Sequence, residues 1–199
     1  MLVFWKERLV FLAVPKTGTT AIEDALATRA AAVFRDPPFL KHTPLYRYRR
    51  LVEPFLKKAG DVELETLAVI RNPVEWLGSW YRYRHRDYLV GHPNSTRDIS
   101  FDDFVVEYTK GKPAAFADVG SQARFLSPGG EGKAGIDHLF RYEEQPRMLA
   151  FFEVRFGSPV VLKRLNISPA LELTLEPKTL LRLQNKRGDE FEAWEKAGR

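Results

Sequence analysis

The chain has 199 residues, of which 44% are hydrophobic, and 31 basic against 26 acidic residues give it a net charge of +5. This composition excludes a disordered chain and is typical of one globular domain, so we expect residues 1–199 to form a single domain. Cysteine is absent, which excludes disulfides, thiol catalysis and cysteine-bound zinc. The moderate basic excess favours an anionic ligand and does not by itself indicate nucleic acid.

Membrane and export signals are not found in the sequence. No apolar run approaches the roughly 18 residues that a membrane span requires. The opening segment MLVFWKERLVFLAV is interrupted by charges at residues 6–8, unlike a signal peptide. We therefore expect a soluble, cytoplasmic protein with no integral membrane segment.

Two apolar segments open the chain, and we expect residues 2–5 and 9–14 to be strands around the charged turn. The second strand leads into PKTGTT at residues 15–20 and then into a helical pattern over residues 21–32. Thr20 and Glu23 have the spacing of a capping box, which predicts that the helix begins at this loop. Residues expected to bind an anion there are Lys16, Thr17, Gly18, Thr19 and Thr20.

The physical reason for an anion site is the sequence of strand, tight glycine-containing turn and helix N-terminus. This arrangement points several backbone N–H groups and the positive end of the helix dipole at one place. The loop does not match the Walker A pattern G-x-x-x-x-G-K-[ST], because its lysine comes two residues before Gly18. An ordinary turn with a solvated lysine is the alternative interpretation.

A second segment has the same order of strand, short turn and helix N-terminus. Residues 64–70 read as another buried strand, followed by Arg71, by Asn72 as a helix N-cap and by Pro73 at the first helical position. Open α/β sheets bind ligands at the carboxyl ends of their strands, where Arg71 is expected. Ser79 follows about two helical turns later, so the two side chains are suited to hold one phosphate. The alternative is an Arg71 ion pair with a local carboxylate.

The remaining pattern alternates strands with helices. Helices are expected at residues 46–58, 73–90, 101–108 and 122–126, around Pro146, and on both sides of Gly188. Strands are expected at 137–142 and 160–165, and residues 127–135 are expected to be a glycine-rich loop at the edge of the site. The alternation predicts a three-layer α/β fold with a mostly parallel central sheet.

The two motifs resemble those of sulfotransferases that use 3′-phosphoadenosine 5′-phosphosulfate (PAPS). PKTGTT is similar to the loop of that family that binds the 5′-phosphosulfate, and RNPVEWLGS to the motif whose arginine and serine bind the 3′-phosphate. The triplet RYE at residues 141–143 resembles a later strand–helix unit of the same family. The resemblance implies a P-loop, nucleotide-kinase-like fold, with PAPS as donor, adenosine 3′,5′-bisphosphate (PAP) as product, and no required metal.

The resemblance also implies catalytic roles. Lys16 would neutralise charge on the departing phosphate, which suits a positive group near the bridging oxygen. His42, in LKHTPL, lies where several carbohydrate sulfotransferases have a Lys-His pair whose histidine is the base. A structural role for His42 and a carboxylate base, Glu63 or Glu65, are the alternatives. His138 is expected to be structural.

The expected reaction is transfer of a sulfuryl group to an acceptor hydroxyl of a saccharide or small molecule. Two other functions remain as alternatives: a nucleotide or small-molecule kinase of the P-loop type, and a non-catalytic module that binds anionic glycans or nucleic acid. Magnesium dependence distinguishes the first, and salt dependence without preference for a 3′-phosphorylated nucleotide distinguishes the second. Acceptor identity and oligomeric state are not indicated by the sequence.

Overall fold

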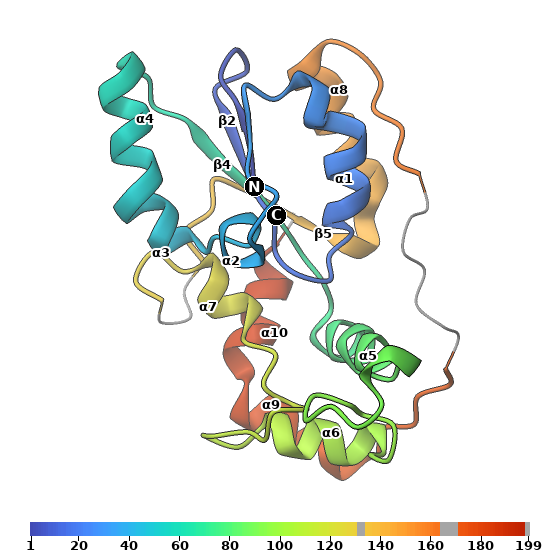
Figure 1. Cartoon of the computed structure of the whole chain (residues 1–199). Coiled ribbons are helices and arrows are strands. Elements are labelled where there is room, and N and C mark those ends of the chain that lie inside the picture. The colour runs from blue at the N-terminus through green and yellow to red at the C-terminus, as the bar shows by residue number, and fades with distance from the viewer. Residues whose placement is uncertain (131–133, 164–170, 198–199) are drawn as a thin grey trace.

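One five-stranded sheet organises the protein, and Figure 1 shows it with its surrounding helices. The computed structural model describes residues 1–130, 134–163 and 171–197. The strand order is β3-β1-β2-β4-β5. The strands are β1 Leu2–Phe4, β2 Leu9–Leu12, β3 Ala32–Val33, β4 Glu65–Ile70 and β5 His138–Arg141.

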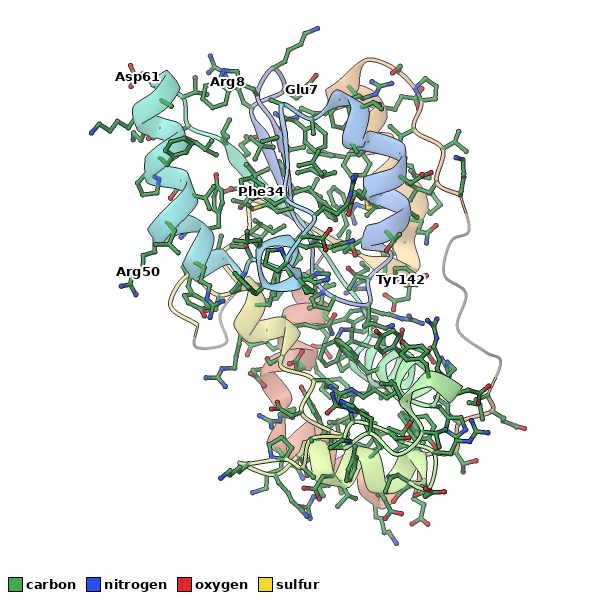
Figure 2. The ribbon with its side chains drawn as sticks, in the orientation of Figure 1. Glu7, Arg8, Phe34, Arg50, Asp61 and Tyr142 are labelled. Carbon is green, nitrogen blue, oxygen red and sulfur yellow. The ribbon has the colours of Figure 1, made fainter. Side chains whose placement is uncertain are left out.

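The sheet is mixed, so the expectation of a P-loop, nucleotide-kinase-like fold with a mostly parallel sheet is wrong. β2, β4 and β5 pair in parallel, whereas β1 is antiparallel to both β2 and β3. The cause is the short connection 5–8 between β1 and β2, since a parallel pair needs a crossover of about a dozen residues. This hairpin closes through Arg8 at φ 52°, and Figure 2 labels Glu7 and Arg8 at its tip.

Strand residues alternate between the two faces of the sheet, and helices cover both. On one face, Leu9, Phe11 and Val69 belong to a core that includes buried residues of two helices. These helices are α1 Thr19–Leu26 and α8 Gln145–Phe156. Gly157, at φ 66°, ends α8 as its position predicts.

The other face carries a second core around Val10, Leu12 and Ile70. It is covered by a continuous helical segment and by two helices from later in the chain. The elements are α3 Leu45–Arg47, the π-helical turn Tyr48–Val52, α4 Glu53–Gly60, α7 Gln122–Leu126 and α10 Gly188–Lys196.

A third core lies beyond the carboxyl ends of the parallel strands (Figure 1). It contains Trp76, Phe104 and Leu183, each buried between helices rather than against the sheet. The helices are α5 Pro73–Arg84, α6 Phe101–Tyr108 and α9 Pro177–Lys186. The carboxyl ends of β2, β4 and β5 therefore face this helical cluster.

Short elements complete the described chain: α2 Pro38–Lys41 and 3-10 turns Ala27–Arg29, Asp87–Leu89 and Tyr142–Glu144. The helix expected over 73–90 ends earlier, at Arg84. Of the strand expected at 160–165, residues 160–163 are not a strand and the rest lies outside the described residues, as do residues 131–133 of the glycine-rich loop. Within the described ranges, no helix is long and apolar enough to cross a bilayer.

Candidate functional site

The loop between β2 and α1 has an unusual backbone. Lys16 has φ 67° and Gly18 has φ 76°, both in the left-handed region. Gly18 is the N-cap of α1, and no side chain of the described residues caps the helix, which begins at Thr19. The first N–H groups of α1 are consequently not bonded to a capping side chain and face the end of the loop.

The predicted capping box between Thr20 and Glu23 is not formed. Glu23 instead bonds to Arg35, at 2.5 Å from Nε, and to Lys41, at 2.9 Å from Nζ. These two cations arrive from a later part of the chain and hold the pKa of Glu23 below its usual range, although burial acts in the opposite direction as the largest single effect. A tertiary ion pair has replaced the local cap.

Tyr142 closes over the same loop from the end of β5. A Cβ atom added to Gly18 would lie 3.0 Å from Tyr142 Cε2, so only glycine fits without displacement. The Arg71 guanidinium lies 4.6 Å from the centre of the Tyr142 ring. Tyr142 thus links the loop after β2 to the residue after β4, and Figure 2 labels it at the carboxyl end of the sheet.

Arg71 is held in place through its backbone. Its N–H donates to Gln122 Oε1 at 3.0 Å, and its carbonyl accepts from Gln122 Nε2 at 2.9 Å. Its side chain contacts the exposed Glu75 at 3.3 Å, while the Arg71 Nε is buried without a hydrogen-bond partner in the described part of the chain. The local ion pair expected as an alternative is present, but it leaves the buried Nε donor of the guanidinium without a partner among the described residues.

All eight residues predicted for the site line one cavity of about 970 Å³. They are Lys16, Thr17, Gly18, Thr19, Thr20, His42, Arg71 and Ser79. Thr17 contributes differently from the expectation, because its hydroxyl donates to Val14 O at 2.9 Å and fixes the loop instead of pointing to a ligand. Ser79 is 8% exposed.

The charge of this cavity is strongly one-sided. Among its described lining residues, six are cationic and none is a carboxylate; the cations are Lys16, Lys41, Arg71, Arg82, Arg86 and Lys163. Several of them pair with carboxylates outside the lining. For Lys16 and Arg86, no described carboxylate lies within ion-pair distance. Such a cavity attracts a ligand with more than one negative charge.

Lys16 is the most perturbed of these cations. Its Nζ lies 4.1 Å from the centre of the Tyr83 ring and 5.4 Å from that of Trp80. Burial is the main cause that lowers the pKa of Lys16 to about 8, and the nearby charges of Arg86 and Arg71 act in the same direction. A bound anion would relieve this repulsion and favour the charged amine.

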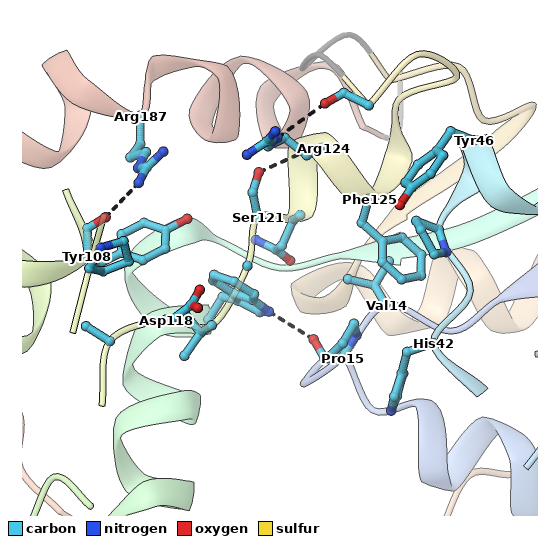
Figure 3. A pocket seen from close by; sticks show the side chains of 18 of the residues that line it. Val14, Pro15, His42, Tyr46, Tyr108, Asp118, Ser121, Arg124, Phe125 and Arg187 are labelled. Atoms are coloured by element: carbon cyan, nitrogen blue, oxygen red, sulfur yellow. Dashed lines mark hydrogen bonds between the residues drawn. The ribbon is translucent and has the colours of Figure 1, made fainter. Parts of the chain in front are cut away.

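His42 has one ring nitrogen committed. Its Nδ1 lies 2.7 Å from Ala13 O, and because a carbonyl only accepts, Nδ1 carries the proton and Nε2 the lone pair in the neutral ring. Burial is the main cause that lowers the pKa of His42, which favours this neutral form. His42 and Pro15 are both labelled in Figure 3, at the boundary with a second cavity.

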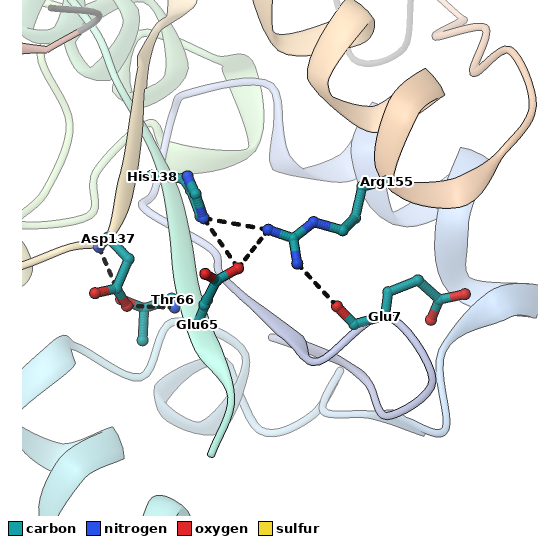
Figure 4. A network of polar contacts seen from close by, with 6 residues as sticks. All are labelled: Glu7, Glu65, Thr66, Asp137, His138 and Arg155. Atoms are coloured by element: carbon teal, nitrogen blue, oxygen red, sulfur yellow. Dashed lines mark hydrogen bonds and ion pairs between the residues drawn. The ribbon is translucent and has the colours of Figure 1, made fainter. Parts of the chain in front are cut away.

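The alternative bases do not line the cavity. Glu63 is an exposed side chain paired with Lys57 at 2.5 Å. Glu65 lies at the amino end of β4, where it bonds to His138 Nε2 at 3.1 Å and to Arg155 (Figure 4). The site is at the opposite, carboxyl end of these strands, so this network is separate from it.

Sequence reasoning missed several lining residues. Tyr142, Gln145 and Lys163 come from distant segments, and only Tyr142 had a usable signal, since it ends the strand expected at 137–142 and lies in the RYE triplet. Arg82 and Arg86 also line the cavity, whereas Arg84 on the same helix is buried and donates to the carbonyls of Ala115 and Asp118.

Comparison with known proteins adds no assignment: the chain matches no protein-family model and no curated protein.

Proposed function

We propose that the chain is a sulfotransferase that moves the sulfuryl group of PAPS to an acceptor hydroxyl. The observation that carries the proposal is the 970 Å³ cavity, which brings the PKTGTT loop, Arg71 and Ser79 together among six cations with no carboxylate in its described lining. PAPS carries negative charge at both its 5′ and 3′ positions, so a cavity that contains both the loop after β2 and the Arg71–Ser79 pair suits it.

The donor is held at two points. The 5′-phosphosulfate binds the uncapped N-terminus of α1 and Lys16, where backbone N–H groups and the helix dipole favour an anion. The 3′-phosphate binds Arg71 and Ser79, and it supplies an acceptor for the buried Arg71 Nε. The aromatic residues Trp80, Tyr83 and Tyr142 supply flat surfaces in the same cavity.

The transfer forms one bond and breaks another. The acceptor oxygen bonds to sulfur as the bond between sulfur and the 5′-phosphate oxygen breaks, and the bisphosphate leaves with the electron pair. His42 Nε2 takes the hydroxyl proton, and Lys16 stabilises the charge on the leaving oxygen. Because the sulfuryl group carries less charge than a phosphoryl group, we expect these cations to suffice without a metal.

Calorimetric binding of PAP, with 5′-AMP and Mg·ATP as comparators, tests the donor site. We expect magnesium-independent binding of PAP that is at least about tenfold tighter than that of 5′-AMP, since the 3′-phosphate adds charge-assisted hydrogen bonds. A preference for Mg·ATP would instead support a kinase, and binding of none would refute the proposal.

We propose a cytoplasmic location for the protein, which cell fractionation would test.

The role of His42 is tested separately. His42→Ala is expected to lower turnover about 100-fold or more while PAP affinity stays within about twofold, because general base catalysis contributes roughly 10²–10⁴-fold. His138→Ala is the matched control, since His138 lies at the other end of the sheet. Unchanged turnover in His42→Ala would assign the base to another residue.

A further inference from the structure

A second cavity, of about 610 Å³, adjoins the cationic one. Among the described residues, only Pro15 and His42 line both cavities. Pro15 begins the loop that is proposed to hold the phosphosulfate, and His42 presents the free Nε2. A molecule in the second cavity therefore has its nearest approach to the donor at the proposed base. The volume is within the range of pockets that hold small organic ligands.

The far side of this cavity is cationic. Figure 3 shows Arg124 and Arg187 across the cavity from His42. Arg187 Nη2 donates to the carbonyl oxygens of Tyr108 and Lys110, at 2.8 and 3.2 Å, and Arg124 Nε donates to Gly130 O at 3.2 Å. These partners are carbonyl groups, so they orient the two guanidinium groups without neutralising their charges.

Arg187 retains an unused donor. Its Nε is buried and has no hydrogen-bond partner in the described part of the chain. Asp118 is the single carboxylate among the described lining residues, and it lies beside the buried cation Arg84. Arg84 Nη2 donates to the backbone carbonyl of Asp118 at 2.8 Å, and although burial lowers the pKa of Arg84, the Asp118 charge acts to raise it. The cavity as a whole is thus positively charged at the end opposite His42.

The wall between these ends is aromatic. Tyr46, Phe125 and Trp76 line it, and the Trp76 ring is fixed because its Nε1 donates to Pro15 O at 2.9 Å. Fixed aromatic faces pack against the flat, apolar faces of ring compounds such as sugars and phenols. The cavity therefore offers a cationic end, a flat middle and a base.

We propose that this cavity binds an acidic acceptor, a ring-containing hydroxyl compound whose carboxylate or sulfate group is held by Arg124 and Arg187 while its hydroxyl lies at His42 Nε2. This inference rests on the proposed sulfotransferase function. An acidic saccharide has all three features.

The test uses matched pairs of acceptors that differ only in the acid group: a glucuronate-containing disaccharide with its neutral glucose counterpart, and 4-hydroxyphenylacetate with 4-ethylphenol. In at least one pair, we expect the acid to have a kcat/KM at least about tenfold higher than its neutral partner, because it forms a charge-assisted pair. Arg124→Gln is expected to lower this preference to about twofold or less by raising KM, while PAP affinity is unchanged.

Arg49→Gln is the matched control, because Arg49 also donates to a backbone carbonyl, Gly135 O at 3.0 Å, but lines neither cavity. Like Arg124→Gln, Arg187→Gln is expected to lower the preference for the acid, whereas Arg187→Lys, which keeps the charge, is expected to retain it. Three results would each overturn the acidic-acceptor proposal. The protein could use acid and neutral acceptors equally, the preference for the acid could survive Arg124→Gln, or the protein could bind PAP and turn over none of the acceptors. Loss of PAP binding by the unmodified protein would instead overturn the donor site and the proposed function.

Discussion

The turn after β2 and the turn after β4 both carry the chain from a buried strand into a helix, yet they treat their backbone groups differently. After β4, Asn72 Oδ1 accepts from the N–H groups of Val74 and Glu75, at 3.0 and 3.3 Å, and the Asn72 N–H donates to Glu143 at 2.8 Å. Pro73 has no N–H to satisfy. After β2, Gly18 provides no side-chain cap for α1.

This difference predicts that the two turns bind the donor in different ways. The turn after β4 has its backbone donors satisfied and contributes the side chain of Arg71, while the helix that follows contributes Ser79. The turn after β2 leaves its backbone donors open to an anion and adds one cation, Lys16. A helix N-terminus with its cap in place and one without it thus have different capacities to bind phosphate, although the two turns look alike in sequence.

The largest effect is expected from removing the cation of the open turn. Lys16→Met should lower turnover by about 10³-fold, the upper part of the range seen when a single electrostatic stabiliser of a transition state is removed. Sulfuryl transfer at saturating acceptor is the measurement. Turnover above a tenth of the original would refute the role of Lys16.

Lys16→Arg is the control, and it also tests the pKa. With the pKa of Lys16 near 8, the amine of the free protein is charged below this pH and neutral above it. PAP affinity should therefore fall as the pH rises above about 8, and should stay constant in Lys16→Arg, because a guanidinium remains protonated. Equal pH profiles for the two proteins would contradict this expectation.

The backbone of the open turn is tested by Gly18→Ala. The new methyl group would meet Tyr142 at 3.0 Å and would occupy a left-handed position, which costs about 1–2 kcal/mol. We expect PAP affinity to fall about 100-fold as the loop shifts. Gly91→Ala is matched to it, since Gly91 has φ +77° but no atom within 4 Å of the added Cβ, and it should change stability without changing affinity.

Side-chain binding by the capped turn is tested by Arg71→Ala. PAP affinity should decrease about 10- to 100-fold, while affinity for 5′-AMP changes by less than about threefold, because only PAP has a 3′-phosphate. Titration calorimetry with both nucleotides measures the ratio. Equal losses for the two ligands would remove Arg71 from the 3′-phosphate site.

The smallest effect is expected from Asn72→Ala. Loss of an N-cap typically costs about 1 kcal/mol of stability. Thermal or urea unfolding should show this loss, and PAP affinity should remain within about twofold because the Asn72 side chain bonds only to the backbone N–H groups of Val74 and Glu75. A loss of affinity as large as that in Arg71→Ala would mean that Asn72 also takes part in PAP binding.

Local features of the site were predictable and long-range ones were not. The PKTGTT loop and the Arg71-Asn72-Pro73 turn are signalled by residues within a few positions of each other. Tyr142 reaches Gly18 from another strand, and Gln122 reaches the Arg71 backbone from α7; neither contact has a signal in the spacing of residues. The capping box failed for the same reason, because Arg35 and Lys41 recruited Glu23.

The error in the sheet has a different origin. The hairpin around residues 6–8 was expected, and a connection of that length already requires an antiparallel pair. The expectation of a mostly parallel sheet came from the alternation of strands and helices later in the chain. β3, two residues long, lies in a stretch without a strand pattern and pairs only because β1 offers it a free edge.

Three residues other than glycine have positive φ: Arg8, Lys16 and Asp61 in the described chain. Arg8 lies at the hairpin tip and Asp61 follows α4, both remote from the cavities (Figure 2). At these two, glycine would relieve about 1 kcal/mol of backbone strain, so both are open to thermostabilising engineering. Replacing Lys16 by glycine would instead remove the cation on which the proposed chemistry depends. At this position the lysine is therefore kept for its charge, although its backbone is strained.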